Sequence, residues 1–330
     1  MDTLTQQALI VKVEEPSQVA EARRRAAAMG RAVTLDAESL SRLEMVTTEL
    51  GTNMLRHGKG GSIVITSPRV GSVEVIALDR GPGISDLERS LEDGYSTGST
   101  PGLGLGVIRR QSQGTSIFAP ANMGAVMSAL VQSPKLHDVP DVAVVCVPLQ
   151  GEDVCGDTWA RGEVEDRQLF LIADGLGHGS HAAEASQLAA RIFRGALSKS
   201  PDEIVRQMHL PMRATRGAAV MIVSLDRGKR LLRWCGVGNI SGSLQGAESS
   251  RGLSSDNGTV GHQMSRARLQ EAPWSPVDTL IMHSDGLSGR WRMDGYPGLL
   301  SRSLATIAGV LYRDHSRERD DRTVLVAKLA

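Results

Sequence analysis

The stretch from Leu169 to Ser186, LFLIADGLGHGSHAAEAS, constrains the fold of this chain more than any other segment. It opens with an apolar run, which predicts a buried strand that places Asp174 at its end. Glycines then alternate with other residues, which predicts a turn where backbone can approach a ligand closely. From Ser180 small and apolar residues recur at helical spacing, so we expect a helix. Taken alone, the stretch is better interpreted as an ordinary turn with a helix N-cap.

Composition bounds the class of protein. With 330 residues the chain is long enough for two domains, each with its own core. A formal net charge of zero gives no indication of nucleic acid or an anionic membrane as the main partner. No apolar run approaches the ~18 residues that span a bilayer, and the N-terminus does not resemble a signal peptide. The three cysteines are widely spaced and predict no disulfide framework, so we expect a cytoplasmic protein.

The first group of candidate functional residues lies on a predicted helix near the N-terminus. Asp36 suits the N-cap of this helix, and an apolar stripe follows it. Glu49 and Asn53 lie beside that stripe one turn apart, and therefore on one face, before Gly58 ends the helix. As an isolated pair they are better interpreted as solvated side chains.

Two glycine-rich segments follow this helix. A predicted strand delivers Asp79 into Arg-Gly-Pro-Gly, where an aspartate can accept a hydrogen bond from an exocyclic amine such as that of adenine. The run GLGLG at 102–106 then opens a predicted helix, whose free N–H groups and positive dipole end favour phosphate. A single glycine run is weak evidence for phosphate binding. The order of the three segments is what favours a nucleotide site.

The segments TELGTNMLRHG, DRGPGI and GLGLG resemble the N, G1 and G2 boxes of the GHKL (Bergerat-fold) ATP-binding family. Their spacing is similar to the small serine kinases of the RsbT/RsbW group, over roughly residues 8 to 130. A histidine kinase is less favoured because no dimerising phosphoacceptor helix precedes the domain. A gyrase or mismatch-repair type of machine is less favoured because no transducer domain follows. The resemblance implies that Glu49 is a general base toward a serine hydroxyl, that Asn53 binds Mg²⁺ at the phosphates of ATP, that Asp79 holds adenine, and that Gly83, Gly102, Gly104 and Gly106 line the nucleotide.

A polar segment with two prolines at 133–140 separates two patterned regions. We therefore predict an N-terminal domain at 1–133, a linker at 134–140 and a C-terminal domain at 141–330. In the second domain, predicted strands place aspartates at 157, 174, 285 and 320 or 321, with glycine beside three of these sites. Converging carboxylates repel one another unless a cation lies between them. Ligation by oxygen alone favours Mg²⁺ or Mn²⁺ over zinc, whereas four unrelated surface turns remain the alternative.

The set GD…ADGLGHG…SDG…DD resembles the SpoIIE-type branch of the metal-dependent serine/threonine (PPM) phosphatases, over about residues 141 to 330. The resemblance implies two Mn²⁺ or Mg²⁺ ions and a turn or cap role for His178 and His181, and the helix after Ser180 becomes a candidate regulatory surface. The predicted fold is α+β, a Bergerat α/β sandwich followed by an α-β-β-α sandwich. The implied metal ligands are Asp174, which bridges the two ions and is catalytic, the Gly175 carbonyl, Asp285, Asp320 rather than Asp321, and Asp157 through water.

Together the two resemblances predict a bifunctional regulator, an ATP-dependent serine kinase fused to the phosphatase that reverses it. The implied partner is a STAS-domain protein of the anti-sigma-antagonist or stressosome type. One alternative is a module that sequesters a sigma factor, with phosphatase as its one activity. A second alternative, a scaffold with one inactive site, is less favoured because every carboxylate that the motifs require is present.

Overall fold

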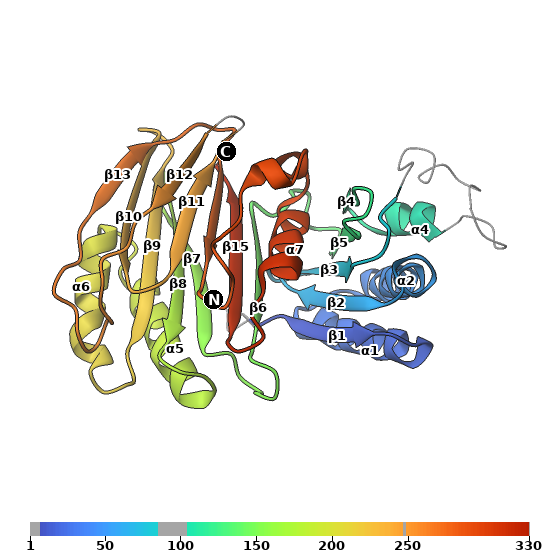
Figure 1. Ribbon diagram of the computed structural model, residues 1–330, viewed down its shortest axis with the longest axis horizontal. Coiled ribbons are helices and arrows are strands. Elements are labelled where there is room, and N and C mark those ends of the chain that lie inside the picture. The colour runs from blue at the N-terminus through green and yellow to red at the C-terminus, as the bar shows by residue number, and fades with distance from the viewer. Residues whose placement is uncertain (1–6, 85–103, 247–248, 330) are drawn as a thin grey trace. The chain divides into compact units, whose positions relative to one another are not determined.

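The computed structural model describes residues 7–84, 104–246 and 249–329. These residues form two compact units, and each unit is described by itself (Figure 1). Unit 1 comprises Met1–Ala143 together with Pro297–Arg313, and unit 2 comprises Val144–Tyr296 with Asp314–Ala330. No helix among the described residues is long and apolar enough to cross a membrane.

Unit 1 is built on a five-stranded antiparallel sheet in the order β1-β2-β3-β5-β4. In this sheet, β4 and β5 pair antiparallel on either side of residues 121–124. The elements of unit 1 up to residue 132 are β1 (Leu9–Val13), α1 (Pro16–Ala32), α2 (Ala37–Asn53), the short π-helix η1 (Met54–Gly58), β2 (Gly61–Thr66), β3 (Ser72–Asp79), α4 (Gly104–Gln111), β4 (Gly114–Phe118) and β5 (Val126–Gln132).

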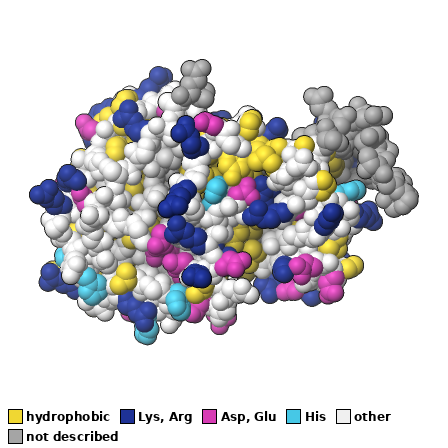
Figure 2. All heavy atoms as spheres, in the orientation of Figure 1, with side chains coloured by type: hydrophobic (Ala, Val, Ile, Leu, Met, Phe, Trp, Pro, Cys, Tyr) yellow, Lys and Arg dark blue, Asp and Glu magenta, His cyan; other side chains and the backbone are white. Residues whose placement is uncertain are grey.

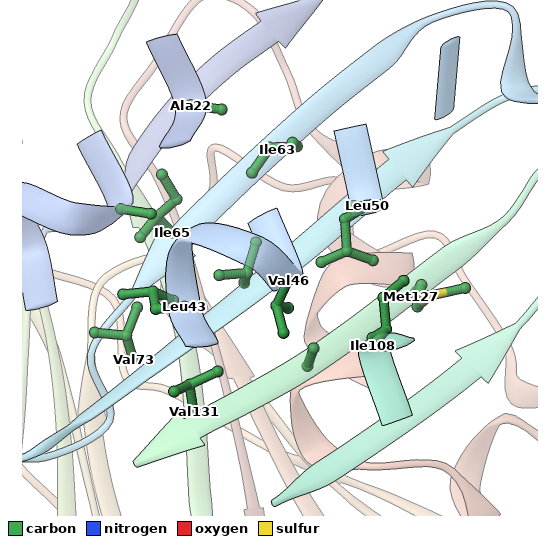
Figure 3. Packing of buried hydrophobic residues seen from close by; sticks show 14 of the residues in the cluster. Ala22, Leu43, Val46, Leu50, Ile63, Ile65, Val73, Ile108, Met127 and Val131 are labelled. Carbon is green, nitrogen blue, oxygen red and sulfur yellow. The ribbon is translucent and has the colours of Figure 1, made fainter. Parts of the chain in front are cut away.

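Helices α1, α2 and α4 bury their apolar stripes against one face of this sheet. The N-cap predicted for α2 is confirmed, since the Asp36 carboxylate accepts a hydrogen bond from Ser39 N at 2.9 Å. Figure 3 shows how the stripe of α2 meets the strands. The residues labelled in this cluster are Ala22, Leu43, Val46, Leu50, Ile63, Ile65, Val73, Ile108, Met127 and Val131.

Residues 297–313 belong to unit 1, although they follow most of unit 2 in the sequence. They contain the 3₁₀ turn η3 (Leu299–Ser301) and most of helix α7 (Leu304–His315). The linear division at 134–140 therefore differs from the compact units in one respect. A segment of the predicted C-terminal domain packs with the N-terminal one, which composition along the chain could not indicate.

Unit 2 contains two five-stranded sheets, in the orders β13-β10-β9-β8-β7 and β12-β11-β14-β15-β6. Its helices and strands, with β6 beginning just before the boundary of the unit, are β6 (Val142–Val147), β7 (Asp157–Val164), β8 (Arg167–Gly175), α5 (Ser180–Arg194), α6 (Pro201–Met212), β9 (Ala218–Asp226), β10 (Leu231–Val237), β11 (Ser241–Gln245), β12 (Ser250–Leu253), β13 (Gln270–Pro273), β14 (Thr279–His283), η2 (Met293–Gly295) and β15 (Arg322–Lys328).

Helices α5 and α6 cover one face of the first of these sheets (Figure 1). Phe193 of α5 and Met208 of α6 lie in one buried cluster with Leu171 of β8. The strand, turn and helix predicted from Leu169 to Ser186 are thus confirmed as β8, a glycine turn and α5. Two helices that the sequence analysis did not predict, α6 and α7, complete the helical set of the described chain.

On the face that Figure 2 draws, basic and acidic side chains are interspersed. This agrees with the formal net charge of zero. Among the described residues on this face, neither sign gathers into one large field of the kind that binds nucleic acid. The predicted fold class, mixed α and β in both halves, is confirmed.

Candidate active sites

The four aspartates singled out in unit 2 lie where strands begin or end. Asp157 opens β7 and pairs directly with Asp174 near the end of β8, so both carboxylates project from the same face of their sheet. Asp285 follows β14, and Asp320 precedes β15, which pairs with β14. The ends of two antiparallel strand pairs, β7 with β8 and β14 with β15, therefore carry these acidic groups.

Asp157 is held by the strands of the other sheet of unit 2. Its Oδ2 accepts a hydrogen bond of 2.7 Å from the Ser284 hydroxyl, and that hydroxyl oxygen accepts one from Thr323 N. Its Oδ1 is buried and has no hydrogen-bond partner within the described residues. Burial, opposed by the Ser284 hydrogen bond, raises the pKa of Asp157 to about 7. A buried carboxylate oxygen with no donor is the kind of group that a cation satisfies.

Asp174 lies among like charges. Burial raises the pKa of this carboxyl well above its ordinary value, and the charges of Asp157, Asp285 and Asp320 raise it further. The pKa of Asp320 is also raised, first by burial and then by Asp285. Asp285 itself is held by Asn239, whose Nδ2 donates to Oδ2 at 2.7 Å. Neighbouring negative charge therefore adds to burial in disfavouring ionisation of Asp174 and Asp320.

Asp320 and Asp321 are adjacent in the sequence but have different surroundings. Asp321 is buried, with an exposed fraction of 2%, and both of its oxygens are used. Leu149 N donates to Oδ1 at 2.8 Å and Gly156 N to Oδ2 at 2.9 Å, which closes the loop between β6 and β7. Asp320 faces Asp285 instead. This arrangement supports Asp320 as the ligand and gives Asp321 a structural role.

Two glycines allow the ends of β8 and β14 to pack closely against neighbouring backbone. A Cβ on Gly175 would lie 2.0 Å from the carbonyl oxygen of Ala182, at the start of α5. A Cβ on Gly286 would lie 1.8 Å from the carbonyl oxygen of Asp321. Any side chain at either position would push the helix or the β15 loop away from the carboxylates. The glycines beside Asp174 and Asp285 are therefore required by packing.

A cation fits the chemistry of this cluster. In the described part of the chain no three histidine, cysteine or acidic side chains form a ready-made metal-binding group. The donor set nevertheless consists of carboxylates, of which Asp157, Asp174 and Asp320 have raised pKa values, and the buried Oδ1 of Asp157 lacks a donor within the described residues. Hard, oxygen-preferring ions such as Mg²⁺ and Mn²⁺ are the ones that such a set selects.

The two histidines near the glycine turn lie outside this cluster. His178 Nδ1 is 2.7 Å from Glu152 Oε1, and both side chains are partly exposed. His181 lies in the first turn of α5, 4.0 Å from the Glu184 carboxylate. Their positions agree with the turn and helix-cap roles that the resemblance implies.

In unit 1, Asp79 ends β3 at the turn that the sequence assigns to adenine. Its Oδ1 accepts hydrogen bonds from Gly81 N at 2.8 Å and from Ala125 N at 3.1 Å. The turn approaches its surroundings so closely that a Cβ on Gly58 would lie 2.7 Å from the Asp79 side chain. Gly83 has a φ of +77°, and a Cβ there would lie 2.2 Å from the Pro120 carbonyl oxygen. Backbone N–H groups therefore hold Oδ1 of this carboxylate.

Glu49 and Asn53 occupy the last turns of α2, one turn apart as predicted. Asn53 Nδ2 is buried, and within the residues that the structure describes it has no hydrogen-bond partner. The helix then widens into η1, and π-helical turns are frequent at functional sites. Gly104 and Gly106 lie in the first turn of α4, whereas Gly102 lies outside the described residues. The phosphate end of this candidate site is therefore described only in part.

Comparison with known proteins finds a family match in each half of the chain. Residues 165–330 match the model of the Stage II sporulation protein E (SpoIIE) family, which spans half of the chain. The chain belongs to the SpoIIE family. Residues 13–123 match the histidine kinase-like ATPase domain, so a SpoIIE unit is fused here to an ATPase-like unit. The fusion predicted from the motifs is confirmed.

Curated relatives match each half of this SpoIIE-family protein. Phosphoserine phosphatase RsbX of Bacillus subtilis (strain 168) is 25% identical over 189 residues, which cover 55% of this chain and 90% of RsbX. Serine/threonine-protein kinase RsbT of the same organism is 32% identical over 93 residues, which cover 27% of this chain and 70% of RsbT. The N-terminal match indicates membership of the RsbT-like ATPase group.

Solved structures show the fold of the SpoIIE unit. A chain from a study of the bacterial stressosome aligns with a TM-score of 0.53 at 25% identity, over 57% of this chain and 98% of that one. RsbX in complex with magnesium aligns with a TM-score of 0.51 at 23% identity, over 57% of this chain and 94% of that one. Unit 2 therefore has the PPM phosphatase fold.

Two residues near the carboxylates, Ser284 and Asn239, were not predicted as contributors to the site, and Asp321 was considered only as an alternative metal ligand. Ser284 hydrogen-bonds to Asp157, Asn239 to Asp285, and Asp321 clamps the β6–β7 loop. Ser284 and Asp321 lie within the motifs SDG and DD, so their neighbours in the sequence marked them. Asn239 lies in the loop between β10 and β11, where no pattern in the sequence singled it out.

Proposed function

We propose that this protein is a metal-dependent phosphoserine/phosphothreonine phosphatase joined to an ATP-dependent serine kinase. The observation that carries the phosphatase half is the set of acidic strand ends in unit 2, with a buried, unpartnered oxygen on Asp157. Asp174, Asp285, Asp320 and the Gly175 carbonyl hold Mn²⁺ or Mg²⁺ in this proposal, with Asp157 acting through water. Bound metal supplies an activated water and neutralises the phosphoryl oxygens.

The chain's own groups have separate tasks in this proposal. Ser284 fixes the Asp157 carboxylate, and Asn239 fixes that of Asp285, so each acid is oriented before a metal binds. Asp321 keeps the β6–β7 loop closed beside them. Hydrogen bonds from neighbouring residues thereby organise the site.

The kinase half of the proposal rests on unit 1. Asp79 would accept a hydrogen bond from the exocyclic amine of adenine, since two backbone N–H groups hold its carboxylate through Oδ1. Asn53 would hold Mg²⁺ at the phosphates, and its buried amide is a polar group in need of a partner. Glu49, one turn earlier, would take the proton from the attacking serine hydroxyl. Gly83, Gly102, Gly104 and Gly106 would line the nucleotide.

The proposed partner is a STAS-domain protein of the anti-sigma-antagonist or stressosome type. The support is that the two halves resemble, respectively, a kinase and a phosphatase named RsbT and RsbX, and that a stressosome study contains a protein of similar fold. Opposed activities on one chain would set the phosphorylation state of that partner. The proposed location is the cytoplasm.

The phosphatase half is tested without a known partner. Hydrolysis of p-nitrophenyl phosphate is measured for the wild type and for Asp174→Asn, with and without Mn²⁺. A matched control is Asp166→Asn, an exposed aspartate at the β7–β8 turn. We expect metal-dependent turnover in the wild type and the control, and its loss in Asp174→Asn. Equal turnover in all three proteins would overturn the assignment of Asp174.

The kinase half is tested with candidate STAS proteins, ATP and Mg²⁺ in an Asp174→Asn background, which removes the reverse reaction. We expect phosphate incorporation into serine, and its loss when Glu49→Ala is added. Nucleotide binding with no incorporation by either protein, together with capture of a sigma factor, would instead support a sequestering module with phosphatase as its one activity.

A further inference from the structure

Helix α7 belongs to the compact unit that carries the candidate nucleotide site, although its sequence lies within the SpoIIE match. In unit 1 one face of the sheet is covered by α1, α2 and α4, with Val75 and Ala77 of β3 in that core. Strand residues alternate between faces, so Glu74 and Ile76 lie on the opposite face. This second face of the sheet is the one that α7 covers.

The contact between α7 and the second face is close. A Cβ on Gly309 would lie 2.8 Å from Ile76 Cγ2 and 3.0 Å from Val126 Cγ1, so the helix axis approaches the strands where a glycine permits it. At the N-terminus of the helix, the Ser303 and Ser128 hydroxyls lie 2.8 Å apart. Helix and sheet are thus joined by packing and by buried hydrogen bonds.

The last turn of α7 reaches the backbone of the nucleotide turn. Arg313 Nη1 donates to the carbonyl oxygen of Asp79 at 3.1 Å. In return, the Arg80 guanidinium donates to the carbonyl oxygen of Arg313. Two reciprocal hydrogen bonds therefore fix the peptide of the residue whose carboxylate would accept adenine. Arg313 lies outside the sequence that matches the ATPase domain, residues 13–123.

The chain that continues from α7 is bonded to a loop of unit 2. The carbonyl oxygen of His315 accepts from Ser288 N at 2.8 Å. Arg317 N donates to the carbonyl oxygen of Gly286 at 2.8 Å, and Arg317 Nη1 to that of Asp285 at 3.1 Å. Asp285 is a proposed metal ligand. The residues that fix Asp79 and those that fix the Asp285 loop are therefore neighbours along one short stretch, 313–317.

We propose that α7 is a functional part of the nucleotide site, with Arg313 as a positioning residue for Asp79, and that through this helix a bound nucleotide changes metal binding at the Asp285 loop. This inference rests on the proposed ATP binding by unit 1. Nucleotide binding orders the Asp79 turn and, with it, Arg313. Because helix α7 is covalently continuous with His315–Arg317, the same order extends to the Asp285 loop.

Linkage makes the effect reciprocal, so that metal in unit 2 changes nucleotide affinity by the same factor. The two sites of one chain would thereby be coupled, which two separate proteins could not achieve in this way. The level of ATP would set not only the forward reaction but also the metal occupancy of the site that reverses it.

The first test measures the affinity of the full chain for a non-hydrolysable ATP analogue with Mg²⁺, by titration calorimetry. Arg313→Met removes the donor and keeps the length of the side chain, and Arg313→Lys keeps a charged donor. Arg302→Met is the matched control, an exposed arginine of the same segment. We expect about a tenfold loss of affinity in Arg313→Met. Most of that loss should be restored in Arg313→Lys, with no change in the control.

Melting temperatures without nucleotide separate positioning from folding, since Arg313→Met should melt within about 2 °C of the wild type. Should that variant not fold, Arg80→Met removes the reciprocal hydrogen bond and carries the same expectation. A wild type that does not bind the analogue would overturn the proposed ATP site itself. A wild type and an Arg313→Met variant with equal affinity would overturn the present inference alone.

The second test measures Mn²⁺ affinity by calorimetry with and without saturating analogue. We expect the analogue to change Mn²⁺ affinity at unit 2 by about fivefold or more. Asp174→Asn removes that heat and identifies it as belonging to the phosphatase site. In Arg313→Met, at analogue concentrations that restore saturation, the ratio of the Mn²⁺ affinities with and without the analogue should approach one. Equal Mn²⁺ affinity in both nucleotide states of the wild type would contradict the linkage.

Discussion

At the scale of single residues, Glu74 is an unexpected group. It lies on the second face of the unit 1 sheet, fully buried, with the Ser128 hydroxyl as its hydrogen-bond partner. Burial raises the pKa of this carboxyl to about 8. Because the folded protein then keeps a proton that the unfolded chain releases, the free energy of unfolding falls as pH rises between about 4.5 and 8.

This leads to a prediction for Glu74→Gln. The wild type should lose up to about 1.4 kcal/mol of stability per pH unit over that window through this one group, and the variant should not. Urea unfolding of unit 1 is followed at several pH values from 5 to 8. Glu38→Gln, an exposed glutamate in the first turn of α2, is the control. Parallel pH profiles for wild type and Glu74→Gln would contradict the burial of a protonated carboxyl.

Asp320 and Asp321 give opposite predictions although they are adjacent. Asp320→Asn removes one of several facing charges, so the metal-free protein should become more stable while Mn²⁺ no longer raises its melting temperature. Asp321→Asn leaves a loop N–H without its acceptor, so unit 2 should lose about 1–3 kcal/mol in the metal-free state. Melting with and without Mn²⁺ distinguishes the two. The reverse pattern would make Asp321 the ligand.

At the scale of elements, α7 is most sensitive at Gly309. Alanine favours a helix interior by about 1 kcal/mol, but its Cβ would meet Ile76, Val126 and Leu78. We expect overpacking to prevail, so Gly309→Ala should destabilise unit 1 by about 1–3 kcal/mol. Gly295→Ala, where a Cβ meets open space, is the matched control. Equal unfolding midpoints for both variants would show that α7 does not pack on this face as described.

The elements also show what the sequence can predict. The strand, turn and helix around Asp174 were predictable because an apolar run, alternating glycines and a helical stripe follow one another there. Helix α6 was missed although Ser200 and Glu203 form a capping box around Pro201, which is a recognisable start. Helix α7 carried no such pattern, since every residue from Ala305 to Tyr312 is buried and no polar face marks it.

At the scale of the whole molecule, the order of motifs predicted which chemistry each half carries but not which residues pack together. A linear boundary follows polarity and proline along the chain, whereas compact units follow contacts. Residues 297–313 are the instance, because their neighbours in space lie more than 160 positions earlier in the sequence, as with Ser303 and Ser128. Hydrogen bonds that hold a candidate ligand, such as that from Asn239 to Asp285, could likewise not be predicted from the sequence, because they depend on tertiary contact alone.

The measurement that tests the account most directly follows phosphate in both directions on one serine of a STAS partner. Wild type, Glu49→Ala and Asp174→Asn are each incubated with the unphosphorylated partner, ATP and Mg²⁺, and with the phosphorylated partner and Mn²⁺. We expect Glu49→Ala to remove phosphate and add none, and Asp174→Asn to add phosphate and remove none. Loss of both reactions in either single variant, or of neither, would contradict two opposed sites on one chain.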